Sequence, residues 1–378
     1  MQSGVRANPR SYDNLDYDYD NDNDAEGIHE SLATSHSTSD PIMLQDLRWL
    51  RHYLRVRLIG WVRQRRNRPP RTDELLFVVQ ETARGWIMET ICKNLCAHYP
   101  GRARLHYPAA PHEPLPAAAA YFFVHQNEAI AALARDPNVW RGVRLVQYTH
   151  PSHESTVVRA AEIVYALDHQ SRVLTMNSRA REALIASGVR PERVATLVGA
   201  SDPERFRPHQ RPGTGVVGLS CAYYPRKNPE LMAAVIRAMP DLHFILIGKD
   251  WEQWDGFAAL LTCPNFEYLT IPYADYPAAY ARMDVFLSTS ALEGGPIPLI
   301  EAMMCNLVPV VSDTGFAPDI IRHGENGYLF PVDAEAQQVA GLIRQALANP
   351  CDVAATATHL SWQAMALELH RQVNDCRP

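Results

Sequence analysis

Lysine is scarce in this chain. Of the 36 basic residues among 378, only Lys93, Lys227 and Lys249 are lysines, and arginine supplies the rest of the positive charge. The two residue types are not interchangeable, because a lysine ammonium is a compact charge on a flexible stem. The positions at which this chain departs from arginine are therefore informative.

Cysteine motifs and long apolar runs are missing as well. The seven cysteines are an odd number without C-x-x-C spacing, so we expect neither a disulfide framework nor a zinc site. No apolar run reaches the roughly 20 residues of a membrane-spanning helix. An apolar core does not follow the first charges, so no secretory signal is expected. Together these absences predict a cytoplasmic protein.

Charge is distributed unevenly along the chain. Residues 1–40 contain nine acidic residues and two arginines in a polar, repetitive segment ("YDNLDYDYDNDNDAEG"). Such a segment cannot bury enough apolar surface to offset its ordering entropy, so residues 1–43 are predicted to be a disordered acidic tail. Residues 44–71 reverse the sign, with nine arginines and one aspartate. The remainder is mildly acidic, so we expect no nucleic-acid partner.

Residues 44–71 are predicted to form a basic amphipathic helix that Pro69 and Pro70 end. Its apolar residues recur at helical spacing with arginines between and after them; they are Leu47, Leu50, Leu54, Leu58 and Trp61. Such a helix can lie on an anionic membrane surface, which we expect for residues 44–68 and which would place the protein peripherally on the inner face of the cell membrane. Two alternatives stay open: the leucines pack on the protein's own body, or the helix binds a partner protein.

From residue 72 onward, strand and helix patterns alternate, which is typical of parallel α/β sheets with helices on their faces. A Pro- and Gly-rich linker near 202–215 interrupts the alternation, so two domains are expected at 72–205 and 206–355. A final helix within 356–378 is expected to return toward the N-terminal domain. The cleft between the domains is the expected ligand site.

The individual elements follow from the local patterns. In the first domain, strands are expected at 74–80, 120–126, 143–150, 172–178 and 193–199, and helices at 85–100, 127–136, 157–168 and 179–189. In the second part, strands are expected at 215–220, 243–248, 266–271, 284–290 and 308–313, and helices at 228–240, 276–283, 296–306, 333–350 and 359–373. Gly213, Gly215 and Gly218 spell a dinucleotide fingerprint, but they enter a strand instead of opening a helix, so no nicotinamide site is expected.

Two glutamates frame a tight turn in "ALEGGPIPLIEAMM". Glu293 follows a strand, and Glu301 lies one turn into the next helix, which Pro298 helps to start. Ligands of open α/β sheets bind at the carboxyl ends of strands, and a helix N-terminus there suits a phosphate. Gly294 and Gly295 let the backbone approach a ligand closely. This pattern favours a polyhydroxylated, phosphorylated ligand; the alternative is a solvated Glu293 and a Glu301 that only complements the helix dipole.

Three segments resemble a known family. "EGGPIPLIEAMMCNLVPVVSDTGFAPDIIRHGENGYLF" resembles the E-x7-E region of family-four retaining glycosyltransferases (glycosyltransferase group 1), which have the two-domain GT-B fold. "LTMNSRAREALIASGVRPERVATLVGASDPERFRP" is similar to the end of that family's N-terminal domain, and "VVGLSCAYYPRKNPELMAAVIRAMPDLHFILIG" to the start of its donor-binding domain. The resemblance covers about 72–373, and it implies two Rossmann-like α/β domains facing a cleft.

The resemblance implies roles for residues of the second domain. Glu293 matches the glutamate beside the donor sugar, and Glu301 matches the one that binds ribose hydroxyls. Backbone amides around Ile297, Pro298 and Leu299, with Gly294 and Gly295, would meet the sugar and phosphates. Lys227 matches the lysine that neutralises the donor diphosphate, with Arg226 beside it; the alternative for this pair is a solvated helix start. An arginine that the family usually has before this lysine is replaced here by Cys221 and Ala222.

In the first domain, the resemblance implies that His150 lies near the reacting sugar, where a histidine can donate to a hydroxyl or support developing positive charge. His125 and His153 are rivals for that role. Gly85 matches the family's glycine-rich loop, which approaches the donor phosphates.

The function implied is transfer of a sugar from a nucleotide diphosphate sugar to a glycan or lipid-linked acceptor, with retention of anomeric configuration, in envelope polysaccharide or glycoconjugate synthesis. The first domain would bind the acceptor and the second the donor, without a metal or another cofactor. Two alternatives remain: a catalytically degenerate GT-B protein that acts as a binding or scaffold module, and a GT-B-like nucleotide-sugar epimerase.

Overall fold

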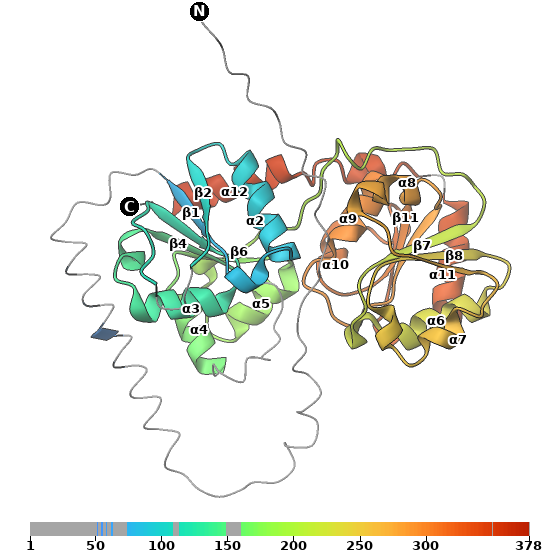
Figure 1. Cartoon of the computed structure of the whole chain (residues 1–378), viewed down its shortest axis with the longest axis horizontal. Helices are drawn as coiled ribbons and strands as arrows, with labels where there is room; N and C mark the ends of the chain where they lie inside the picture. Colours follow the sequence, from blue (N-terminus) through green and yellow to red (C-terminus); the bar gives the residue numbers. More distant parts are fainter. Residues whose placement is uncertain are drawn as a thin grey trace, which may run out of the picture.

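The computed structural model describes residues 74–108, 113–148, 160–349 and 351–377, together with Arg51, Leu54, Arg55, Leu58 and Val62. The predicted acidic tail, His150, His153 and most of the basic segment lie outside the described residues. Two parallel sheets with helices on their faces stand side by side (Figure 1).

The N-terminal sheet is parallel throughout, in the order β2-β1-β3-β4-β5-β6. Its strands are β1 (Leu75–Val78), β2 (Ala103–His106), β3 (Ala120–Phe123), β4 (Val143–Tyr148), β5 (Arg172–Thr175) and β6 (Val194–Thr196). Its helices are α2 (Ile87–His98), α3 (Gln126–Arg135), α4 (Ala160–Asp168) and α5 (Ser178–Ala186). The central strands β1 and β3 are buried at every position, as expected for strands covered on both faces.

The C-terminal sheet is also parallel, in the order β12-β11-β10-β7-β8-β9. Its strands are β7 (Val216–Ser220), β8 (His243–Ile247), β9 (Phe266–Leu269), β10 (Val285–Ser288), β11 (Val308–Ser312) and β12 (Tyr328–Phe330). The helices that follow these strands are α6 (Pro229–Ala238), α7 (Phe257–Leu260), α8 (Tyr276–Tyr280), α9 (Ile297–Met304), α10 (Ala317–Ile320) and α11 (Ala336–Ala348).

The order of this second sheet fixes where a ligand can bind. The chain runs outward from β7 through β8 to β9, and then returns to place β10 on the other side of β7. The strand order therefore reverses between β7 and β10, and ligands of open α/β sheets bind at the carboxyl ends of such a pair. The loop after β7 carries Arg226 and Lys227, and the loop after β10 carries Glu293.

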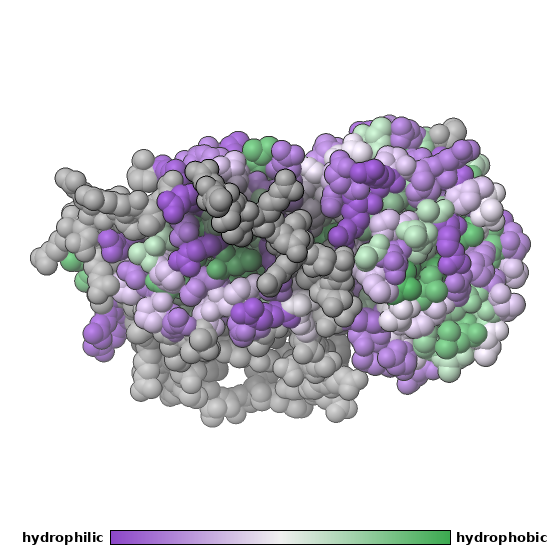
Figure 2. Space-filling view, turned by 45° about the horizontal axis from the view of Figure 1, so that its top comes forward, coloured by the Kyte–Doolittle hydropathy of each residue, from purple (hydrophilic) through white to green (hydrophobic). Residues whose placement is uncertain are grey.

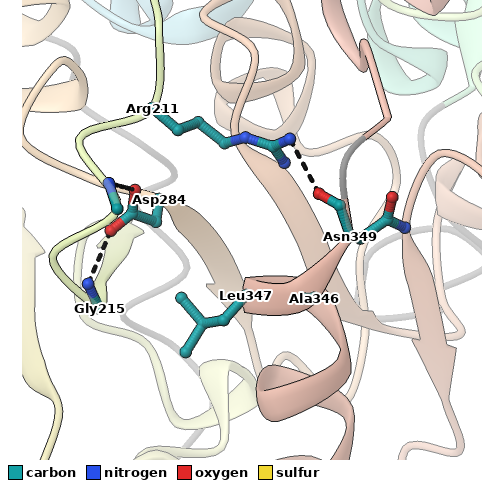
Figure 3. Close-up of a pocket in the computed structure, with 7 residues that line it drawn as sticks. Arg211, Gly215, Asp284, Ala346, Leu347 and Asn349 are labelled. Atoms are coloured by element: carbon teal, nitrogen blue, oxygen red, sulfur yellow. Dashed lines mark hydrogen bonds between the residues drawn. The ribbon is translucent and has the colours of Figure 1, made fainter.

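Asp284, immediately before β10, organises the linker between the domains. Its buried carboxylate accepts hydrogen bonds from the N–H groups of four consecutive residues, 213–216, at 2.6 to 3.2 Å. Gly213 and Gly215 have positive φ angles of 68° and 78°, which allow this turn. The fingerprint-like glycines thus shape a linker, beside a cavity of about 310 Å³ that Arg211 and Leu347 also line (Figure 3).

The last helix, α12 (Trp362–Asp375), packs on the N-terminal domain. It lies against α2 (Figure 1). The rings of Tyr99 and His370 meet edge to face at 5.1 Å. A bridge between Ser201 and Ser361 adds a second tie near the linker. On the face seen in Figure 2, hydrophobic residues are interspersed with hydrophilic ones. The apolar faces of the helices are turned toward the sheets. No helix among the described residues is long and apolar enough to span a bilayer.

Candidate active site at the domain interface

The backbone after β7 turns Lys227 inward. A short 3-10 helix, Pro225–Lys227, is followed by Asn228 in the left-handed region at φ 53°, which also caps α6. Thr289 Oγ1 donates to the Lys227 carbonyl at 2.9 Å. As a result the lysine is only 4% exposed. A solvated helix start is therefore the wrong description of this position.

The Lys227 ammonium meets the carboxylate of Glu293. Lys227 Nζ lies 2.5 Å from Glu293 Oε1, and Arg226 Nη1 lies 3.3 Å from Glu293 Oε2. The Ala291 N–H donates to the Arg226 carbonyl at 2.7 Å, which joins the two loops through the backbone as well. Glu293 is 8% exposed and not solvated. The structure thus brings three sequence-predicted residues into one buried cluster.

The two cations keep Glu293 ionised. Burial by itself raises the pKa of the Glu293 carboxyl, but Lys227 and Arg226, with hydrogen bonds from Lys227 and Ser290, outweigh it and lower the pKa below its usual value. A buried carboxylate is costly unless it is paired, so the cations and Glu293 depend on one another.

The N-terminus of α9 offers fewer amides than its sequence position suggests. Pro298 has no N–H, and the Leu299 N–H donates to the Pro296 carbonyl at 3.0 Å. The N–H groups of Gly294, Gly295 and Ile297 have no acceptor among the described residues. These three groups, beside Lys227, are the donors that an anion could use.

Gly295 is required by packing as well as by any ligand. A Cβ atom at this position would lie 2.5 Å from Phe316 Cδ1 and 2.7 Å from Met176 Cε. Gly315, at φ 58°, similarly makes room for Glu293, whose own Cβ would lie 2.9 Å from an added Cβ. Gly295 therefore lets the loop fit against the other domain, and Gly315 lets it fit against its own.

Glu301 occupies a different environment. It is 1% exposed, and Tyr273 and Tyr280 donate hydroxyl hydrogen bonds to its two oxygens at 2.6 Å and 3.2 Å. Burial is the main cause that raises the pKa of Glu301 to about 7, although both tyrosines lower it. Glu301 therefore does more than complement the helix dipole. The tyrosines lie on η7 (Tyr273–Asp275) and α8, far from Glu301 in the sequence. The only sequence signal for them is the clustering of tyrosines in that segment.

Two sequence-predicted residues of the first domain, Gly85 and His125, make hydrogen bonds within that domain. Gly85 has a φ of 81°, and its N–H donates to the buried Glu89 carboxylate at 2.8 Å. That amide is engaged within its own domain. His125 accepts a hydrogen bond from the Asn127 N–H at 3.2 Å and so caps α3.

Cys221 does not replace the missing arginine. Its N–H donates to the Ile247 carbonyl at 3.0 Å, and its carbonyl accepts from Trp251 Nε1 at 2.9 Å. Burial raises the pKa of its thiol to about 11, so it carries no charge near neutrality. Positive charge at this loop comes from Arg226 and Lys227.

Among the described residues, no cluster of three or more His, Cys, Asp or Glu side chains is arranged to hold a metal ion.

Comparison with known proteins shows what the chain is similar to. Residues 202–361, which contain this cluster, match the family model described as Glycosyl transferases group 1. The C-terminal part of the chain, which holds the cluster, is therefore similar to the glycosyl transferases group 1 family. A phosphatidyl-myo-inositol mannosyltransferase of Mycobacterium tuberculosis is 29% identical over 199 residues, which are 51% of this chain and 50% of that protein. The chain thus matches about half the length of the curated relatives.

Solved structures share the two-domain architecture over 80% of this chain. Anabaena HepE, in complex with UDP and glucose, superposes with a TM-score of 0.63 at 16% identity, over 80% of this chain and 99% of that one. Sucrose-phosphate synthase of Thermosynechococcus elongatus gives 0.61 at 15% identity, over 80% and 100%. At these identities the likeness establishes the fold, which is GT-B, as predicted.

The ion pair generates a stability prediction. We expect Lys227→Met to lower the free energy of unfolding by about 3 kcal/mol, because Glu293 loses its nearest cation while it stays buried. Glu293→Gln alone should also destabilise, whereas the double variant should recover most of the loss. Urea denaturation of the four proteins, followed by tryptophan fluorescence, measures this coupling. Strictly additive effects would show that the two side chains are independent.

Glu301 generates a prediction about pH. Its pKa is raised from 4.5 to about 7 on folding, so its contribution to stability is complete below about pH 4.5 and is lost as the pH rises through 7. Relative to Glu301→Gln, the wild type should lose on the order of 3 kcal/mol of unfolding free energy between about pH 5 and about pH 8. Denaturation of both proteins at the two pH values checks this. A difference that does not change with pH would contradict the raised pKa.

Proposed function

We propose that this protein is a retaining glycosyltransferase that transfers a sugar from a nucleotide diphosphate sugar to a hydroxyl of a glycan or lipid-linked acceptor in envelope polysaccharide or glycoconjugate synthesis. The observation that carries the proposal is the buried Lys227–Glu293–Arg226 cluster beside the N-terminus of α9. It lies at the point where the strand order of the sheet reverses, as ligand sites of open α/β sheets do.

The donor diphosphate fits the positive side of this cluster. Lys227 Nζ carries three donors, so it can bind a phosphate oxygen while it keeps its contact with Glu293. The N–H groups of Gly294, Gly295 and Ile297 would bind the same anion. As the glycosidic bond breaks, negative charge builds on the diphosphate, and fixed donors of this kind stabilise it. The positive charge of Lys227 and Arg226 would take the place of a divalent metal.

Retention follows from a reaction on one face of the sugar. The acceptor hydroxyl would attack from the side that the diphosphate leaves, and a phosphate oxygen would take its proton. Glu293 stays ionised between two cations, which suits it to orient sugar hydroxyls and not to act as an acid. A closed interface between the domains would exclude water from the reacting sugar.

A lipid-linked acceptor at the inner face of the cell membrane fits the basic segment. Leu54 and Leu58 lie one turn apart in a helix and are 46% and 60% exposed. Arg51 and Arg55, also one turn apart, are exposed too. Exposure of both leucines favours a membrane surface over packing on the protein's own body. The related mannosyltransferase is named for a lipid acceptor, which supports the same conclusion.

A panel of nucleotide sugars tests the reaction. We expect one donor to bind the wild type in ligand-observed NMR, and Lys227→Ala to weaken its affinity at least tenfold because the diphosphate loses a charge-assisted partner. Arg344→Ala, which removes one exposed positive charge from the same domain, is the matched control and should bind normally. The transferred sugar should have the donor's anomeric configuration by proton coupling constants.

Other outcomes of this panel identify the alternatives. Free nucleotide and an epimerised sugar, formed without an acceptor, would indicate an epimerase. Failure of every donor to bind would indicate a binding or scaffold protein.

Vesicle binding tests the basic segment. We expect the full chain to co-sediment with phosphatidylglycerol-containing vesicles and not with pure phosphatidylcholine, because the arginines need anionic headgroups. Leu54→Ser with Leu58→Ser should abolish binding, whereas Leu261→Ser, at an exposed leucine of the C-terminal domain, should not. Equal sedimentation with both lipids would contradict an electrostatic membrane contact.

A further inference from the structure

The segment 176–179, after β5, reaches from the N-terminal domain into the loop that carries Glu293. Asn177 is at its centre and is 4% exposed. The side-chain oxygen of Asn177 accepts from the Ala180 N–H at 2.7 Å, which caps α5. Its amide nitrogen donates to the Gly294 carbonyl at 2.8 Å, in the other domain. One side chain therefore begins a helix and holds the residue next to Glu293.

The neighbours of Asn177 bind the same part of the C-terminal domain. The Ser178 N–H donates to Asp319 at 2.8 Å, and the Ser178 hydroxyl donates to the same carboxylate. Asp319 thus supplies negative charge at the N-terminus of α5, where the helix dipole favours it. Arg179 Nη2 donates to both carboxylate oxygens of Asp313, at 2.8 and 2.7 Å, and Arg179 Nη1 donates to the Asp313 carbonyl at 2.7 Å.

Apolar packing makes the junction tight. Met176 and Phe316 come from opposite domains, and both lie within 3 Å of where a Cβ of Gly295 would be. Gly199 fills the matching position on the N-terminal side, where an added Cβ would lie 2.8 Å from Ile297. A shift of one domain would therefore disturb the backbone at Gly294 and Gly295.

Both flanks of this junction are connected to Glu293. Gly294 follows Glu293 directly, and its carbonyl is held by Asn177. The Glu293 N–H donates to Thr314 Oγ1 at 3.2 Å, and Thr314 follows Asp313, the partner of Arg179. The loop that carries Glu293 is thus held by one contact across the domain junction, from Asn177, and by one within its own domain, from Thr314 beside the partner of Arg179.

We propose that Asn177 is a positioning residue that couples domain closure to the placement of Glu293, and that Ser178 and Arg179 form a latch with Asp319 and Asp313 around it. The proposal rests on the proposed function for its catalytic consequence and on geometry alone for the latch. Asn177 acts through Gly294 and needs no contact with substrate.

Burial indicates which contact matters most. The Arg179 and Asp313 side chains are about half and a third exposed, and exposed pairs contribute little to stability. The Asn177 bond is buried, so its loss leaves the Gly294 carbonyl without this donor in a place that excludes water. Asn177 should therefore affect the loop more strongly than Arg179.

Asn177→Asp separates the two roles of this side chain. Aspartate caps a helix as well as asparagine does, so α5 is kept, but it has no N–H to donate to Gly294. We expect the kcat of the full chain to fall about 10- to 100-fold, while the affinity for the nucleotide sugar stays within about threefold of wild type. Arg344→Ala is again the control. Unchanged kcat, or a loss of donor affinity as large as the loss of kcat, would overturn the positioning role.

A second measurement follows the latch without any chemistry. Distances between spin labels on the two domains should lengthen in Arg179→Glu and return in the double variant Arg179→Glu/Asp313→Arg, which restores the pair with its charges reversed. Distances unchanged in Arg179→Glu and in Asn177→Asp would overturn the latch. Because this readout needs no donor, a normal latch response in a protein that binds no nucleotide sugar would contradict the proposed function alone.

Discussion

The buried ion pair between Lys227 and Glu293 is the constraint on which the rest of this site depends. Each charge would be too costly to bury alone, and together they hold the loop after β7 against the loop after β10. Asn228 in the left-handed region, Thr289 on the Lys227 carbonyl and Arg226 on the second carboxylate oxygen all serve this contact. In a chain with only three lysines, the compact ammonium of Lys227 makes this buried contact.

The fold supplies the setting for that pair. Parallel strands deliver their carboxyl-terminal loops to one edge, and the strand order reverses between β7 and β10, where ligands of open α/β sheets bind. The N-terminal domain presents the cap of α5 to the same loop. The site is therefore built from two strand ends and one helix end, and its closure depends on how the domains sit together.

The sequence was informative where local pattern determines structure. Buried strands such as β1 and β8 have continuous apolar runs. Lys227 and Glu293 lie in the loops after β7 and β10, so their convergence was predictable, whereas Glu301 lies apart from them beside two tyrosines. The edge strands β2 and β12 were missed because β2 is only half-buried along its length and β12 has three residues. Tyr273, Tyr280 and Asn177 were missed because each meets its partner from far away in the chain. The prediction that backbone amides around residues 297–299 would meet the ligand was partly wrong. Pro298 has no N–H group, and the Leu299 N–H already donates to the Pro296 carbonyl.

The carboxyls of Glu293 and Glu301, eight positions apart, have pKa values shifted in opposite directions. This difference determines which hydrogen bonds each can make. Glu293 has two cations and stays charged, so it can only accept hydrogen bonds. Glu301 has two tyrosine hydroxyls and a pKa of about 7, so near neutrality it can accept or donate. A vicinal diol such as that of a ribose presents both donors and acceptors, which suits Glu301 better than a fixed anion would. Glu301 is 1% exposed behind Tyr273, which donates to it at 2.6 Å, and the Arg205 guanidinium of the linker lies 4.9 Å from the centre of the Tyr273 ring.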